Sequence, residues 1–93
     1  MTVKIFIKRR VPEKNSVELA LLLNKMRGLT LNQSGYISGE TLKRIDQNDE
    51  CMVISTWRSV EDWNNWVNNE KRIVLQSEID NLLGSETEYA IYE

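Results

Sequence analysis

The alternation of side chains near the N-terminus constrains the fold of this chain more than any other feature. In "VKIFIKR" (residues 3–9), Val3, Ile5 and Ile7 fall on one face of an extended segment. The intervening positions, two lysines around Phe6, fall on the other face. This period of two predicts a strand of about seven residues with one face buried. A sheet with such a face needs a covering layer.

The segment after this strand has the spacing of an amphipathic helix. Pro12 stops the strand and suits the first turn of a helix. Apolar residues then recur at steps of three and four, which predicts a helix running to about Asn32 with Gly28 inside it. The residues of this apolar stripe are Leu19, Leu22, Leu23, Met26 and Leu29.

The remainder of the chain supplies three more strands and a second helical region. "GYISGETLKRI" (35–45) and "CMVISTW" (51–57) are typical of strands, and the polar residues 46–50 between them are typical of a hairpin loop. Ser59 with Asp62 has the form of a capping box, so a helix begins at Ser59. We expect this helix to bend or break at "NNEKR" and the second helical stretch to end at Gly84, before a closing strand in "TEYAIYE".

The element order predicts one α+β domain over residues 1–93. The order βαββαβ is the ferredoxin-like arrangement, a four-stranded antiparallel sheet with helices on one face. The other face would expose Phe6, together with either Met52 and Ile54 or Cys51 and Val53. An apolar sheet face of that size is typical of an association surface, so we expect a homodimer formed through the sheet faces.

Composition excludes several classes of function. The chain has no histidine and one cysteine, which excludes histidine-dependent nucleophilic triads, histidine-ligated metals and thiolate metal clusters, so no metal and no cofactor is expected. The net charge of −2 gives no nucleic-acid footprint, and the basic run at residues 8–10 is interpreted as a solvated strand end. A lone cysteine and the absence of a long apolar run favour a cytoplasmic protein without membrane association.

All three tryptophans lie within ten positions. Trp63 and Trp66 are three residues apart on one helix flank, where packing is the ordinary role. Trp57 ends a predicted strand and would face a cleft between sheet and helices only with the right strand parity, which the sequence leaves open. One register would place Gly39 opposite Trp57, so that the ring covers the glycine. We expect Trp57 to line a cavity while the other two anchor the helix.

Three segments together resemble one known family. "GYISGETL" (35–42), "ISTWRSVEDWNNW" (54–66) and "EYAIYE" (88–93), in this order on a βαββαβ pattern, resemble the antibiotic biosynthesis monooxygenase (ABM) domain family. The resemblance implies a dimeric α+β barrel with a pocket between sheet and helices in each protomer. It also implies that members include cofactor-independent oxygenases of phenolic substrates, haem-degrading enzymes and small proteins without a known activity.

The resemblance suggests individual site residues. Trp57 matches the strand-end tryptophan that walls the family's pocket, and Arg72 falls about where the haem-degrading branch has a histidine. That branch also uses an asparagine on the first strand, which "VKIFIKR" lacks, so haem degradation of that kind is not expected. We take Trp57 and Arg72 as candidate catalytic residues, and Tyr36, Arg58 and Trp66 as candidate substrate-binding residues.

Three functions remain open at the level of sequence. The first is a cofactor-independent monooxygenase acting on a small aromatic or quinol-type substrate. The second is a non-catalytic dimeric protein that binds a small aromatic ligand in the same pocket. The third is a dimer whose pocket has closed over packed side chains. The scarcity of acid–base groups leans slightly against catalysis, and the fold alone does not decide among the three.

Overall fold

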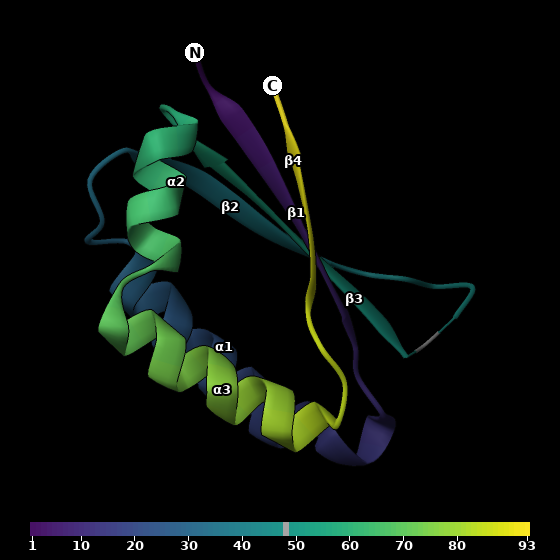
Figure 1. The fold of residues 1–93 in the computed structure, drawn as a ribbon. Helices are drawn as coiled ribbons and strands as arrows, with labels where there is room; N and C mark the ends of the chain where they lie inside the picture. The colour runs from purple at the N-terminus through teal and green to yellow at the C-terminus, as the bar shows by residue number, and fades with distance from the viewer. Residues whose placement is uncertain (48) are drawn as a thin grey trace.

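The computed structural model describes residues 1–47 and 49–93, which form one antiparallel sheet with helices on one side (Figure 1). Every predicted strand and helical region is present. The elements in chain order are β1 (Val3–Arg10), a 3-10 turn η1 (Glu13–Asn15), α1 (Ser16–Thr30), β2 (Tyr36–Lys43), β3 (Glu50–Trp57), α2 (Val60–Val67), α3 (Glu70–Leu83) and β4 (Glu88–Tyr92).

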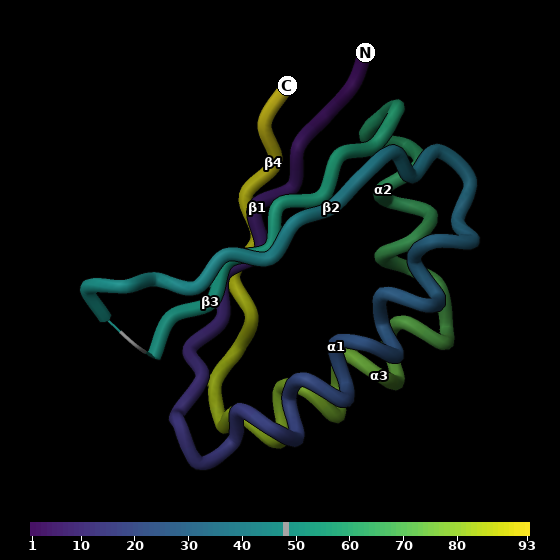
Figure 2. The backbone as a smooth tube through the Cα atoms, turned by 180° about the vertical axis from the view of Figure 1, so that it is seen from behind, coloured from purple at the N-terminus to yellow at the C-terminus, as the bar shows by residue number. Residues whose placement is uncertain are grey.

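The strands lie in the order β2-β3-β1-β4, and all neighbouring pairs are antiparallel. Seen from behind, the helices again lie on a single side of the sheet, and the two termini lie near each other because β1 pairs with β4 (Figure 2). This is the ferredoxin-like α+β fold, as the element order predicted.

The alternation in β1 sets the two faces of the sheet. Val3, Ile5 and Ile7 are buried under the helices. Val3 pairs with Trp57, and the pairing continues so that Phe6 is opposite Ile54. Since paired residues share a face, Trp57 points toward the helices, which settles the parity that the sequence left open.

The open face of the sheet is the one expected to be apolar. It carries Met52 and Ile54 rather than Cys51 and Val53, because these two pair with the outward-facing Lys8 and Phe6. Phe6 packs edge-on against Tyr92 of β4, with 5.0 Å between ring centroids. Ala90 and the half-exposed Leu42 extend the same surface on the outer strands.

Helix ends follow the predicted capping residues. The Ser59 hydroxyl accepts a hydrogen bond from the Asp62 backbone N–H at 3.1 Å, which begins α2. The helical region breaks at Asn68, and the Asn69 side chain caps the start of α3. Gly84, with φ of 68°, ends α3 in the left-handed conformation. The helix predicted to reach Asn32 ends at Thr30 instead.

The hairpin between β2 and β3 differs from one expectation. Tyr36, not Gly39, lies opposite Trp57, and Gly39 lies opposite Ser55. The pairing shifts between Tyr36 and Ser38, so an irregularity at the start of β2 alters the register that spacing alone suggested. The loop predicted at 46–50 joins these strands, although Asn48 lies outside the described residues and Glu50 already belongs to β3.

Within the part of the chain that the structure describes, no helix combines the length and the apolar character that a membrane crossing requires.

Candidate functional site

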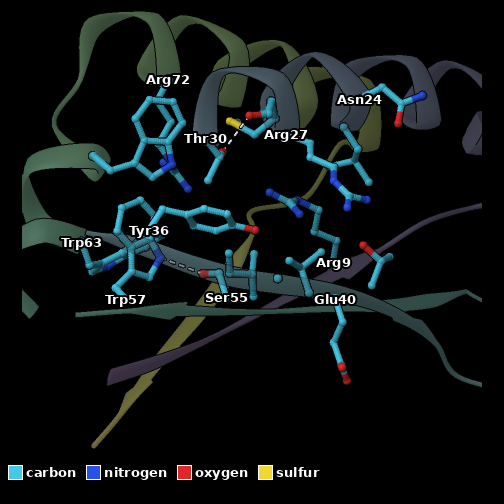
Figure 3. Close-up of a pocket in the computed structure, with 17 residues that line it drawn as sticks. Arg9, Asn24, Arg27, Thr30, Tyr36, Glu40, Ser55, Trp57, Trp63 and Arg72 are labelled. Carbon is cyan, nitrogen blue, oxygen red and sulfur yellow. Dashed lines mark hydrogen bonds between the residues drawn. The ribbon is translucent and has the colours of Figure 1, made fainter. Parts of the chain in front are cut away.

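A cavity of about 130 Å³ lies between the sheet and the helices (Figure 3). Its volume is close to that of apolar cavities that hold one benzene ring, which are about 150 Å³. Six elements contribute to its wall: β1, β2 and β3 form the floor, while α1, α2 and α3 close the other side. The residues that matter most for its chemistry are Arg9, Tyr36, Trp57, Trp63, Trp66 and Arg72.

All three tryptophans line this cavity and are also part of the core. Trp57 is 0% exposed, and Trp63 and Trp66 are each 3% exposed. The Trp57 indole N–H donates to the Ser55 hydroxyl at 3.1 Å, which fixes the ring plane. Its ring packs edge-on against Trp63, with centroids 5.8 Å apart. Trp57 lines the cavity as expected, but the two tryptophans expected to anchor the helix also line it, because α2 turns both of them toward the same space.

Tyr36 enters the cavity from the first residue of β2. Its ring packs edge-on against Trp57 at 5.3 Å, and its hydroxyl points away from the tryptophans into the cavity (Figure 3). Gly39 makes room for it, since a Cβ atom there would lie 2.7 Å from the Tyr36 hydroxyl oxygen. The pair Tyr36 and Gly39 thus places a hydrogen-bond donor over the floor of the cavity.

Arg72 is a buried cation in the first turn of α3. Its side chain is held by aromatic groups: the guanidinium donates to the Tyr89 hydroxyl at 2.8 Å and lies 5.3 Å from the Trp63 ring centroid. It also lies 5.4 Å from the Tyr89 ring centroid, and both contacts are favourable cation–π geometries. At 5% exposure, Arg72 forms no ion pair among the described residues.

Arg9 is a second buried cation, 3% exposed, at the far end of β1. The interpretation of residues 8–10 as a solvated strand end is wrong for this residue. Arg9 has the same parity as Val3, Ile5 and Ile7, so the alternation that identified the strand already placed it on the helix face. The alternation of the strand, and not the charge of the side chain, therefore sets the position of Arg9.

The environment of Arg9 disfavours its charge. Burial lowers the pKa of the Arg9 guanidinium, and the positive charge of Arg72 lowers it further, although Tyr89, Cys51 and Asp80 act in the opposite direction. Guanidinium is too basic to lose its proton in a protein. The lowered pKa therefore reports a cation that is poorly compensated by its surroundings.

Four of the five residues proposed from the sequence come together at the cavity: Tyr36, Trp57, Trp66 and Arg72. Arg58 is not among them. Its side chain is exposed beyond the end of β3, and its backbone N–H donates to the Gly35 carbonyl at 2.8 Å. Because β3 ends at Trp57, the next residue already belongs to the turn into α2 and leaves the helix face.

Acidic groups are scarce at this site. Glu40 touches the cavity wall, but its carboxylate points to the opposite side of the sheet, in line with its pairing opposite Ile54 (Figure 3). Among the residues that the structure describes, no three His, Cys, Asp or Glu side chains gather as a metal site would require. The site combines an aromatic wall, a phenol hydroxyl and two buried guanidinium groups.

The model of the antibiotic biosynthesis monooxygenase family matches residues 2–72. The chain belongs to this family. No curated protein matches it significantly. Solved ABM-like structures share its fold at low identity. A conserved protein from Methanosarcina mazei Go1 is 16% identical with a TM-score of 0.91, over 100% of this chain and 92% of that one.

Two other structures are similar over nearly their full lengths. SnoaB, a cofactor-independent oxygenase from Streptomyces nogalater, is 13% identical with a TM-score of 0.82, over 99% of this chain and 91% of that one. Rv0793 from Mycobacterium tuberculosis is 15% identical with a TM-score of 0.87, over 100% and 94%. At these identities the likeness shows the fold, whereas the family membership comes from the match over residues 2–72.

Proposed function

We propose that this ABM protein is a cofactor-independent monooxygenase of a small, single-ring phenol or quinol. The observation that supports the proposal most is the cavity of about 130 Å³, which is lined by three tryptophans and by the buried cation Arg72. The volume suits one ring, the indoles suit a flat electron-rich ligand, and the cation suits the anion that such a ligand forms when it ionises.

The proposed reaction uses the electron-rich substrate itself as the reductant. The phenol O–H ionises and its proton passes to water, which leaves a phenolate that Arg72 stabilises in a water-poor site. The phenolate gives one electron to O₂, and the resulting superoxide and phenoxyl radical combine at a ring carbon. The peroxide anion formed in this way takes a proton back from water. Loss of water, which includes the hydrogen of that ring carbon, then leaves a carbonyl there. One oxygen atom of O₂ ends in the quinone and the other in water, which balances the two hydrogens lost from the ring C–H and the phenol O–H.

The side chains have distinct roles in this scheme. Arg72 uses one nitrogen on Tyr89, and its position between aromatic rings holds the guanidinium rigidly. The Tyr36 hydroxyl donates to the substrate oxygen. Trp57 and Trp66 orient the ring, so that no large side-chain motion is needed during the reaction.

The experiment is oxygen uptake with a panel of one-ring hydroquinones and phenols. Wild-type protein should consume O₂ and place one atom of isotopically labelled O₂ in a quinone product. Arg72→Gln should lower kcat by about 10²-fold, the typical loss on removing one donor from a developing anion. Arg58→Gln is the matched control, because its exposed side chain lies outside the cavity, and it should keep wild-type activity. Absence of turnover above the uncatalysed rate across the panel would refute the proposal.

A non-catalytic binding role is the second candidate, and one observation favours it. The single carboxylate at the cavity wall, that of Glu40, points away, so none of the described lining residues is a carboxylate base aimed at the ligand. A protein that binds quinols in the same cavity without oxygen uptake would assign it to this role.

We also propose that the protein works as a homodimer that buries the open face of its sheet. The support is the surface formed by Phe6, Met52, Ile54, Ala90 and Tyr92, which the helices of the same chain leave uncovered. A small domain gains stability by covering such a face.

A further inference from the structure

The positive charge of Arg9 has no counter-charge in direct contact among the described residues. Its side chain is 3% exposed, yet it forms no ion pair, and its Nε has no hydrogen-bond partner among the described residues. The ion pairs of the neighbouring basic residues go elsewhere: Lys8 pairs with Glu50 and Arg10 with Asp49. Burial of a charged group without a counter-charge is strongly unfavourable, so such a group calls for an explanation.

A hydrogen-bonded chain nevertheless holds Arg9 in one orientation. Its Nη2 donates to the Gln76 side-chain oxygen at 3.1 Å. The Gln76 amide N–H₂ in turn donates to Asp80 at 2.9 Å and to the Thr87 hydroxyl at 2.8 Å. Because both bonds of the amide nitrogen are taken by acceptors, the oxygen of Gln76 is the atom left to face Arg9. The carboxylate at the end of this series, Asp80, is thereby separated from the cation by a neutral amide.

The fixed guanidinium is directed into the cavity. Figure 3 shows Trp57 and Trp63 toward one end, the Tyr36 hydroxyl in the middle, and the Arg9 guanidinium beyond that hydroxyl. The space therefore runs from an apolar aromatic end to a cationic end. A planar guanidinium with free N–H groups matches the two oxygens of a carboxylate, and it does so better than any neutral group.

We propose that Arg9 is a specificity residue that binds a carboxylate carried by the ligand, so that the natural substrate is a one-ring aromatic acid rather than a neutral quinol. This inference rests on the proposed function for the identity of the ring. It assigns Arg72 and Arg9 to different oxygens: Arg72 holds the ring oxygen that reacts, and Arg9 holds an acid group that does not.

The test compares two ligands that differ only in the charged group. Calorimetric titration with 2,5-dihydroxybenzoate and 2,5-dihydroxybenzamide should show the wild-type protein binding the acid at least about tenfold more tightly, the gain expected of a charge-assisted hydrogen bond. Equal or weaker binding of the acid, or no binding of it at all, would overturn the proposal without any variant.

Variants then assign the preference to one side chain. Arg9→Gln should bring the acid-to-amide ratio close to one, whereas Arg9→Lys should keep part of it, because the charge remains but the planar fork is lost. Arg10→Gln is the matched control on the next residue, whose exposed side chain pairs with Asp49, and it should keep the full ratio. A full preference retained by Arg9→Gln would overturn the assignment.

A stability measurement separates a ligand-binding role from a structural one. Arg9→Met removes a buried charge and keeps much of the side-chain volume, but it leaves the Gln76 oxygen without its donor. These effects oppose each other, so the ligand-free variant should melt close to the wild-type temperature. A large fall in melting temperature would place Arg9 in the structural core and contradict the proposal.

The two proposals fail in different ways. Selective binding of the acid with no oxygen uptake would sustain the carboxylate site and remove the monooxygenase. Oxidation of neutral hydroquinone with no preference for the acid would do the reverse.

Discussion

Truncation of Trp57 tests whether the cavity wall is also the structural core. The side chain is fully buried, packs edge-on against Tyr36 and Trp63, and donates to Ser55. Replacement of a buried Trp by Ala typically costs about 3–5 kcal/mol, and each aromatic pair adds about 0.5–1.5 kcal/mol beyond the area that it buries. Because the existing cavity already removes some contacts from one side of the ring, we expect Trp57→Ala to cost about 4 kcal/mol.

That cost is large for a chain of 93 residues, whose total stability is about 5–14 kcal/mol at the usual values per residue. Trp57→Phe keeps one ring but loses the bond to Ser55, and it should cost about 1–2 kcal/mol. Urea melts followed by far-UV circular dichroism measure both variants without relying on indole fluorescence. With a slope of about 1.5 kcal/mol/M, Trp57→Ala should lower the midpoint by about 2–3 M.

The melts must use one protein concentration for all variants, because a dimer makes the midpoint depend on concentration. If Trp57→Ala lost less than about 1 kcal/mol, the ring would not be a core element, and the packing derived from its neighbours would be wrong. Trp66→Ala is the matched comparison, since that ring is equally buried and comes from the helix side of the cavity.

The remaining predictions concern the sheet face, the cavity floor and the thiol. Phe6→Glu should convert the homodimer into a monomer, because it places a charge in the open apolar face. Light scattering at micromolar concentration measures the mass, and a monomeric wild type would contradict the proposed dimer. Gly39→Ala should weaken the binding of aromatic ligands in calorimetric titrations, since its Cβ would lie 2.7 Å from the Tyr36 hydroxyl. Gly28→Ala is the control, because a Cβ atom there would meet nothing within 4 Å, and it should stabilise α1 by about 0.5–1 kcal/mol in the same urea melts. Equal ligand binding by the two variants would disprove the role of Gly39. Burial raises the pKa of the Cys51 thiol, so alkylation in the folded protein should require a higher pH than in the urea-unfolded chain. Equal rates of alkylation in the two states would contradict that burial.

The fold was predictable because its signals are local. The alternation in β1, the apolar stripe of α1 and the caps at Ser59 and Gly84 each depend on residues close together in the sequence. Their order then leaves few arrangements for four strands and their helices. The end of α1 was less predictable, because Gly28 lies inside the helix and the chain turns only after Thr30.

The site was harder to predict because it depends on pairing between distant strands. The place of Tyr36 opposite Trp57 follows from a register shift at the start of β2, which no periodicity in the sequence reports. Arg9 is a different kind of omission. The alternation of β1 places Arg9 on the buried face, but charged residues are usually exposed. Residues that break such a rule are often part of a functional site.

The features that the proposed ligand would contact are unfavourable for stability in the ligand-free state. The cavity lacks the packing contacts of a filled core. Arg9 and Arg72 are both buried, and neither has a carboxylate partner among the described residues. An anion that fills the cavity restores contacts to the tryptophans and supplies the missing counter-charge at the same time. Since a ligand that binds only the folded state stabilises it by RT ln(1 + [L]/Kd), saturation at 100 times Kd adds about 2.7 kcal/mol. For a domain of this size that is a large fraction of its stability, so the proposed site predicts that a bound anion raises the melting temperature of the protein.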